Sequence, residues 1–293
     1  PPGATISNGQ YLLLVKDQSQ FINAYDRYLP IFDYFPGQLD PGGETLTLLM
    51  PAADTNLPPV VVDQIKYSAL APWPTAVPGQ SLQLKDPAQD HFRVANWAVA
   101  TGTPRASNSV STTLAAFPPL WLNEVQAQNL TGITNSAGQP AAWLELYNRG
   151  TNPVVLTNLY LAATYTNLTA WAFPSNAVIA PGEFKIIFCD GQPNLSSTNE
   201  LHTNFPLPAG AGSLALTRLS GALTQVLDFL DYTNLIPNRS YGSFPDGQLF
   251  DRQQFYYVTP GGPNDRRSAP LTVVINELMA GNTHTLLNPV NGK

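Results

Sequence analysis

The sequence predicts an all-β protein, and three observations lead to this fold class. First, residues 143–148 alternate in type, so a strand would place two leucines on one face and Trp143, Glu145 and Tyr147 on the other. Second, 28 prolines and 21 glycines are spread through 293 residues, which favours short strands joined by turns over long helices. Third, short apolar runs bounded by turn residues recur along the whole chain.

Composition narrows the class of protein further. Hydrophobic residues make up 43% of the chain and charged residues 12%, which is too apolar for a disordered tail and too often interrupted by polar residues for a membrane protein. No apolar run approaches the roughly 20 residues that a spanning helix needs. The net charge of −6, without a basic cluster, argues against a nucleic-acid surface. The only cysteine, Cys189, cannot form an internal disulfide, and its apolar neighbours indicate a buried structural thiol.

The N-terminal part is predicted to hold short strands and one short helix. Apolar side chains recur with helical spacing from Phe21 to Tyr28, so a helix is expected near residues 18–28 and ended by Pro30. Residues 44–49 alternate as a strand does. The other strands expected in this part are residues 11–15, 60–67 and 81–84.

A second set of strands follows a segment rich in small, polar and proline residues. It is expected at residues 120–125, 143–148, 154–162, 184–189, 213–219 and 225–232. We therefore predict five parts: an incomplete unit at 1–108 that lacks its first strands, a linker at 109–119, a complete unit at 120–264, a linker at 265–270, and the opening strand of a third unit at 271–293.

Internal repetition supports this division. The corresponding pairs are Ile6–Asp17 with Ile179–Asp190, Val62-Asp63 and Tyr67 with Leu227-Asp228 and Tyr232, Thr103–Asn108 with Thr259–Asn264, and Leu122–Val125 with Ile275–Leu278. These matches occur in the same order at several separate places. Chance agreement of that kind is rare, so the chain is expected to contain tandem copies of one domain.

These motifs resemble the lamin tail domain family in its bacterial secreted form. The matching segments are Trp121–Val125, Trp143–Asn148, Trp171–Pro174, Leu201–Phe205 and Ser240–Gly247, followed by the Thr-Pro-Gly motif that begins at Thr259. The resemblance covers residues 120–264 well and residues 1–108 in part. It implies tandem immunoglobulin-like β-sandwich domains, an extracellular or cell-surface location in a bacterium, and a scaffold without catalytic residues.

Candidate catalytic residues are few. His91, His202 and His284 have no second histidine or cysteine at metal-ligand spacing, and His202 is expected to make a structural hydrogen bond. Glu145, between two aromatic residues, is the carboxylate best suited to catalysis, because burial would raise its pKa. The alternative is that Glu124 and Glu145 are acids that lie at a sheet edge or cap a strand and bind backbone amides. This alternative agrees with a scaffold, so we expect no enzyme and no catalytic residue.

Two ligand classes stay open. The loop acids at Asp190-Gly191, Asp246-Gly247 and Asp251 carry the oxygen donors that calcium prefers, although acids beside glycine are ordinary turn formers and no EF-hand spacing occurs. We expect no cofactor, with calcium as the alternative. Trp73, between two prolines, is the best candidate for an exposed aromatic contact with surface glycans.

The expected function is that of a non-enzymatic, extracellular structural or adhesive protein. It would belong to a larger multidomain surface protein or to a filament, and its partners would be copies of itself or neighbouring domains. The segment predicted to donate a strand to another subunit is Val273, Val274, Ile275, Asn276, Glu277 and Leu278. Alternatively, the chain is an excerpt with a third domain beyond Lys293. A carbohydrate-binding or substrate-targeting module of a secreted enzyme is the alternative function.

Overall fold

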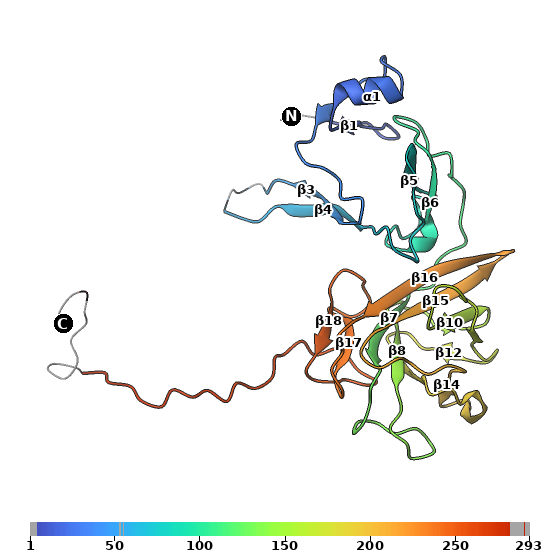
Figure 1. The fold of residues 1–293 in the computed structure, drawn as a ribbon, viewed down its shortest axis with the longest axis vertical. Coiled ribbons are helices and arrows are strands. Elements are labelled where there is room, and N and C mark those ends of the chain that lie inside the picture. Colours follow the sequence, from blue (N-terminus) through green and yellow to red (C-terminus); the bar gives the residue numbers. More distant parts are fainter. Residues whose placement is uncertain (1–4, 53, 55, 282–289, 291–293) are drawn as a thin grey trace.

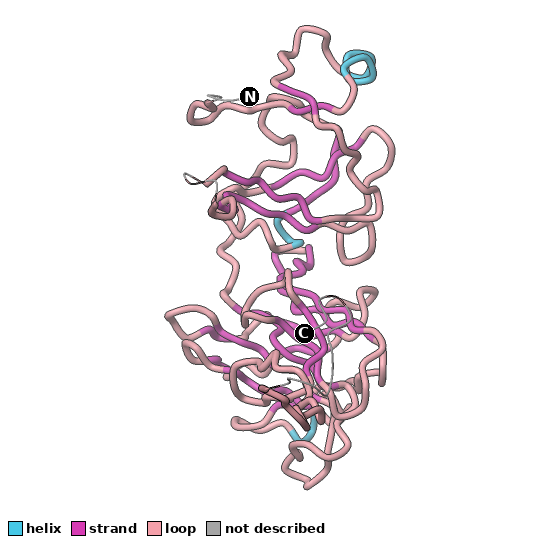
Figure 2. The backbone as a smooth tube through the Cα atoms, turned by 90° about the vertical axis from the view of Figure 1, so that its left-hand side faces the viewer, coloured by secondary structure: helices cyan, strands magenta, loops and turns pink. Residues whose placement is uncertain are grey.

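The computed structural model of the chain describes residues 5–52, 54, 56–281 and 290. It confirms the all-β fold class, since strands dominate and α1 (Gln18–Ala24) is the one α-helix among the described residues. Figure 1 shows two groups of strands, one formed by the N-terminal part of the chain and one by the middle and C-terminal part. Figure 2, turned by 90°, shows the same two groups stacked along the long axis.

The C-terminal group, residues 120–264, consists of two main sheets around one hydrophobic core. Its strands are β7 (Leu120–Gln126), β8 (Trp143–Asn148), β9 (Val154–Val155), β10 (Leu159–Ala162), β11 (Trp171–Ala172), β12 (Val178–Ile179), β13 (Phe184–Phe188), β14 (Leu201–His202), β15 (Gly212–Ser220), β16 (Leu223–Tyr232), β17 (Ser240–Ser243) and β18 (Arg252–Phe255), with the 3-10 helix η2 (Pro193–Leu195). The larger sheet has the order β14-β13-β8-β7-β17-β18, and the smaller has the order β11-β10-β15-β16. Strands β9 and β12 pair separately.

The alternation along β8 positions its side chains as the sequence predicts. Leu144 and Leu146 lie in the core between the two sheets, where apolar side chains from β7, β15 and β16 meet them. Trp143 and Glu145 point to the opposite face and are also buried. Loops that follow β17 and β18 cover that face, and in one of them the Gly261 backbone amide donates a hydrogen bond to Glu145. The outer face of this sheet is therefore a second, partly polar interior.

The N-terminal group, residues 5–108, consists of three two-stranded sheets. Its strands are β1 (Leu14–Val15), β2 (Asp33–Tyr34), β3 (Thr45–Met50), β4 (Val60–Lys66), β5 (Gln80–Leu84) and β6 (Trp97–Thr101), with the 3-10 helix η1 (Val94–Asn96). The pairs are β1 with β2 in parallel, and β3 with β4 and β5 with β6 antiparallel. Many of their apolar side chains face solvent.

The predicted helix near residues 18–28 forms, but it ends at Ala24. Asp17 begins it by accepting hydrogen bonds from the backbone amides of Ser19 and Gln20 at 2.8 and 3.0 Å. Its end has a local cause, because the Asp26 carboxylate accepts the Tyr28 backbone amide at 2.9 Å and forms a side-chain turn instead. None of the residues of α1 is buried.

The described tail, residues 265–281, extends away from the C-terminal group (Figure 1). Residues 271–281 form no strand, and their apolar side chains face solvent. The prediction that 271–293 opens a third unit therefore stays a prediction, since residues 282–289 and 291–293 lie outside the described part of the chain. No helix among the described residues is long and apolar enough to cross a membrane.

Candidate functional site

Two buried carboxylates from neighbouring strands form the most unusual polar cluster of the protein. Glu124 on β7 and Glu145 on β8 are direct cross-strand partners, and a bulge at Asn123 separates them from the regular pairing before it. Both residues are almost fully shielded from solvent. A carboxylate pair at this position is costly unless hydrogen bonds or a bound proton compensate for the lost hydration.

Protein donors reach all four carboxylate oxygens of this pair. Glu124 accepts the Ser240 hydroxyl, and it also accepts the Thr259 amide and hydroxyl at 3.3 and 3.2 Å. Glu145 accepts the Gly261 amide at 2.6 Å and the Asn123 side-chain amide at 3.1 Å. The two acids thus fasten the loop that follows β18 to the middle of the larger sheet. Because every oxygen already has a protein partner, the arrangement is that of a structural clamp.

The loop held by this clamp forms a turn that its sequence encodes. The Gly262 amide donates to the Thr259 carbonyl at 3.1 Å, and Gly261 has a φ of 81°. A type II turn requires a positive φ at its third position and often has proline at its second, which agrees with Gly261 and Pro260. This geometry turns the Gly261 amide towards Glu145. The Thr-Pro-Gly motif therefore supplies one of the clamp's donors.

Burial raises the pKa of both acids. The pKa of Glu124 rises to about 7, mainly through desolvation, while its hydrogen bonds with Ser240 and Thr259 oppose the shift. The pKa of Glu145 rises to about 8, first through desolvation and then through the charge of Glu124. Asp246 adds to both shifts. The direction of the Glu145 pKa shift agrees with the sequence-based expectation, and both acids accept backbone amides as expected. Neither acid lies at a sheet edge, because β7 and β8 are central strands.

His202 makes the structural contacts that the sequence predicts. Its Nδ1 lies 2.9 Å from Asp190 and its Nε2 lies 2.7 Å from Glu200, and the ring is fully buried. The Asn135 side-chain amide also donates to Asp190, at 3.2 Å, and the Ser136 backbone amide donates to Glu200, at 2.9 Å. Both ring nitrogens thus face carboxylates, so the cluster ties the β14 region to neighbouring loops.

Two of the loop acids considered for calcium have other partners. Asp190 binds His202, and Asp246 accepts the amides of Asn123 and Asn264 at 3.0 Å each. Within the described part of the chain, no three His, Cys, Asp or Glu side chains are placed to hold a metal ion. His284 lies outside the described residues.

A buried arginine joins the two groups of strands. Arg93, which precedes η1, is only 2% exposed, and its Nη1 donates to the carbonyls of Leu120 on β7 and Leu227 on β16 at 2.9 Å each. Its guanidinium carbon lies 3.6 Å from the centroid of the Trp121 ring. Burial lowers the pKa of Arg93, while Asp228 and Asp90 oppose that shift. The side chain therefore connects the N-terminal group to both main sheets of the C-terminal group.

An apolar cluster continues this joint. Trp73 and Val94 from the N-terminal group pack with Val226 on β16, and Phe229 and Trp97 lie against them. The prediction that Trp73 is an exposed aromatic is wrong, because the side chain is 5% exposed. The prolines on both sides suggested an irregular surface loop, but this loop packs against the neighbouring group.

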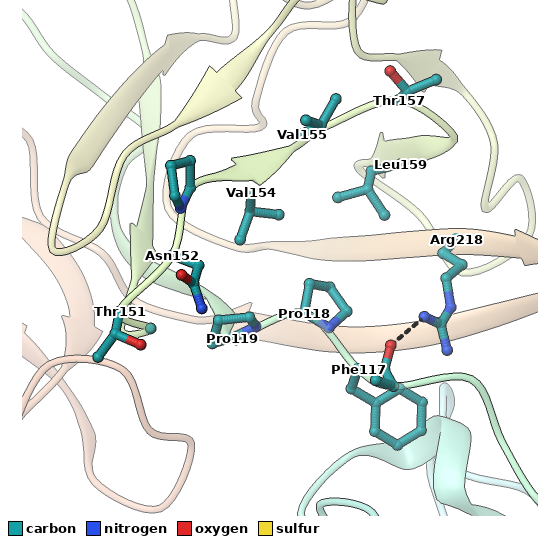
Figure 3. A pocket seen from close by; sticks show the side chains of 13 residues that line it. Phe117, Pro118, Pro119, Thr151, Asn152, Val154, Val155, Thr157, Leu159 and Arg218 are labelled. Carbon is teal, nitrogen blue, oxygen red and sulfur yellow. Dashed lines mark hydrogen bonds between the residues drawn. The ribbon is translucent and has the colours of Figure 1, made fainter.

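The linker at 109–119 is hydrogen-bonded on both sides. On the N-terminal side, the Thr112 amide donates to the Lys85 carbonyl at 3.0 Å. On the C-terminal side, Arg218 on β15 donates to the carbonyls of Ala115 and Ala116 at 2.8 and 2.7 Å. A pocket of about 550 Å³ lies beside this segment (Figure 3), lined by Phe117, Pro118, Pro119, Val154, Leu159 and Arg218 among others. The linker is thus bound to both groups of strands.

The segment predicted to donate a strand is accessible. The apolar side chains of residues 273–278 are between 78% and 90% exposed. No strand pairs with residues 271–281 in the described chain. Strand donation by this segment stays a prediction.

Neither a protein-family model nor a curated protein matches the chain. The resemblance to lamin tail domains therefore stays a prediction that rests on the motifs quoted above.

The role of Arg93 is not evident from the sequence. The residue lies alone in the polar run Gln89-Asp-His-Phe-Arg93, where nothing distinguishes it from a solvated surface arginine. Its neighbour Val94 and the distant Trp121 give no pattern that links them along the sequence. Only the packing of the two groups brings the guanidinium onto the indole ring.

Proposed function

We propose that this protein is a non-enzymatic structural protein of the extracellular space or cell surface, in which successive units are held in a fixed orientation. The observation that supports it best is the joint built around Arg93. A guanidinium between two carbonyls and an indole ring is directional, so it specifies an angle between units as well as their contact. A scaffold that carries load or sets spacing needs such a joint.

The buried acids are consistent with this role. Their four oxygens are bound by the protein, so they stabilise a loop and leave no free carboxylate for a substrate. The low charge content limits long-range repulsion between neighbouring units. The carbohydrate-binding alternative was based on Trp73, and the burial of this side chain removes that basis.

A spin-label experiment tests the proposed fixed joint. Nitroxides attached to Asn23→Cys and Leu223→Cys report the distance between the groups, and the buried native Cys189 does not compete for label. We expect a narrow distance distribution in the parent chain. In Arg93→Ala the distribution should broaden, because two buried carbonyls lose their donor at a cost of roughly 1–3 kcal/mol each.

The matched control is Arg27→Ala, an exposed arginine in the N-terminal group, which should leave the distribution unchanged. A broad distribution in the parent chain would contradict the proposed function, because units joined flexibly cannot set spacing or orientation. A distribution that stays narrow in Arg93→Ala would show that the joint is fixed by other contacts.

A further inference from the structure

The hairpin β3–β4 repeats the hairpin β15–β16 in detail. Both are antiparallel, and the pairing shifts after Leu48 in the first and after Leu216 in the second, at corresponding positions. The carboxylate of Asp63 accepts the next backbone amide at 2.8 Å, as the carboxylate of Asp228 does. The two hairpins therefore present corresponding side chains on corresponding faces.

Corresponding apolar positions differ sharply in burial. Leu214 and Leu216 on β15 and Leu227 on β16 are at most 1% exposed. Their counterparts Leu46, Leu48 and Val62 are between 37% and 61% exposed. The N-terminal hairpin therefore has a face that carries apolar side chains at the positions that are buried in β15–β16. No other described segment shields these side chains from solvent.

Strand β7 provides part of the cover in the C-terminal group. Leu120, Leu122 and Val125 belong to the same buried cluster as the leucines of β15 and β16. The Leu122 backbone amide also donates to Asp228 at 2.8 Å, which fixes β7 against β16. The contribution of β7 is thus a short apolar strand and one hydrogen bond to an aspartate.

The tail repeats the sequence of this covering strand. Ile275-Asn-Glu-Leu278 corresponds to Leu122-Asn-Glu-Val125, and Val273 corresponds to Leu120. In β7 these apolar positions are fully buried, whereas in the tail all three are more than 80% exposed. The chain therefore holds both an uncovered face and an unpaired copy of the segment that covers such a face.

We propose that residues 273–278 of one molecule bind the exposed face of β3–β4 in a second molecule. This inference rests on the proposed structural function and adds the surface through which copies assemble. The exposed side chains of Leu48 and Val62 would be covered by Val273, Ile275 and Leu278. The Ile275 backbone amide would donate to Asp63, as the Leu122 backbone amide does to Asp228. Asp63 already lies in the corresponding conformation, although it also contacts His91 at 2.8 Å.

An apolar pocket marks the inner end of this surface. It has a volume of about 610 Å³ and lies between the hairpins β3–β4 and β5–β6, lined by Leu46, Ile65, Tyr67, Leu82 and Trp97 among others. Its position next to Leu46 makes it continuous with the exposed face. A bulky side chain of a docked segment would enter it and lose contact with water, which favours binding.

One difference between the groups defines how the segment binds. The side-chain amide of Asn108 donates to the Leu84 carbonyl, as that of Asn264 does to the Ser243 carbonyl. Leu84 therefore corresponds to Ser243, and the residue before it, Gln83, corresponds to Gly242. A side chain at Gly242 would clash with the Asn123 carbonyl of β7. Gln83 therefore prevents a close copy of the β17–β7 pairing on β5. The face of β3–β4, and not the edge of β5, is the surface that we assign.

Complementation between two variants of the 293-residue chain tests this assignment. Ile275→Asp removes the donor segment and Leu48→Asp removes the acceptor face, and both side chains are exposed, so neither change disturbs the fold. We expect sedimentation velocity to show concentration-dependent association of the parent chain. Each single variant should associate roughly tenfold to a hundredfold more weakly, the range for removing one large apolar contact.

An equal mixture of the two variants distinguishes the intended contact from other association. Each variant retains the site that the other lacks, so the mixture should form one-to-one dimers and nothing larger. Leu223→Asp, at an exposed leucine that begins β16, is the control and should behave as the parent chain.

The proposal is overturned by a parent chain that stays monomeric up to millimolar concentration, or by a mixture that fails to dimerise. Compaction that does not depend on concentration also overturns it, because the tail would then fold back onto its own molecule. None of these outcomes concerns the joint at Arg93, so the proposed function stands or falls separately by the spin-label distances.

Discussion

The buried pair Glu124 and Glu145 predicts that the C-terminal group loses stability as pH rises through neutrality. The two acids ionise near pH 4.5 when unfolded, and their pKa values rise to about 7 and about 8 on folding. Between these limits the folded state binds more protons than the unfolded state, so the free energy of unfolding falls with increasing pH. The stabilisation is complete below about pH 4.5 and is lost as pH passes about 8.

The magnitude follows from the pKa differences. A shift of one pKa unit corresponds to about 1.4 kcal/mol, so Glu124, raised from 4.5 to about 7, accounts for roughly 3 kcal/mol. The same conversion gives roughly 5 kcal/mol for Glu145. The charge of Glu124 contributes to the shift of Glu145, so the two values do not simply add. We therefore expect a loss of at least about 3 kcal/mol between pH 5 and pH 8.

Urea unfolding followed by tryptophan fluorescence at pH 5, 6, 7 and 8 measures this loss. The double variant Glu124→Gln/Glu145→Gln keeps neutral groups that accept hydrogen bonds, and its stability should lack this pH dependence. Glu183→Gln, a half-buried acid in the same group that pairs with Lys185, is the matched control and should retain it. Equal slopes in the parent and the double variant would refute the reasoning, as would a parent stability that rises towards pH 8.

Two further predictions concern the same group of strands. Burial raises the pKa of the Cys189 thiol to about 12. Thiol reagents at pH 8 should therefore modify the native protein at least a hundredfold more slowly than the protein in urea. Equal rates would contradict the burial of this thiol. His202→Ala removes a ring that contacts two carboxylates and should lower the free energy of unfolding by about 3–5 kcal/mol at pH 6. His91→Ala, at a half-exposed ring, should lower it by less than about 1 kcal/mol in the same urea titration. Similar losses for both histidine variants would show that the His202 cluster is not a stabilising one.

Much of the strand pattern is predictable from local sequence. Residues 143–148 form β8 with the expected bounds, because alternation and the following turn both act within a few residues. The helix shows the limit of such rules. Its spacing continues to Tyr28, yet the Asp26 side chain competes for the Tyr28 amide and the helix ends at Ala24. A single side-chain hydrogen bond thus outweighs the periodic pattern where no packing supports it.

Burial on the outer faces is harder to predict, because it depends on contacts between distant segments. Trp73 reads as an exposed aromatic between prolines until Val226 of another group packs against it. Glu145 reads as an acid that lies at a sheet edge or caps a strand, yet β8 is a central strand and the loop at Gly261 covers it. The sequence pattern identifies which face of a strand can be buried. It does not identify the segment that buries it, as the exposed Leu48 and the buried Leu216 show for one repeated pattern.

The two copies of the closing motif connect the clamp with the joint. The Asn264 amide binds the Ser243 carbonyl where the chain leaves β17–β18, and the Asn108 amide binds the Leu84 carbonyl where it leaves β5–β6. In both places the same side chain fixes the direction in which the chain exits. After Asn108 that direction leads along a hydrogen-bonded linker into β7, beside Arg93. The angle between two units is fixed only if the segments that enter and leave each unit are fixed. The tail leaves the C-terminal group through the loop held by Glu124 and Glu145. This loop should therefore determine how rigidly a partner bound to the tail is positioned.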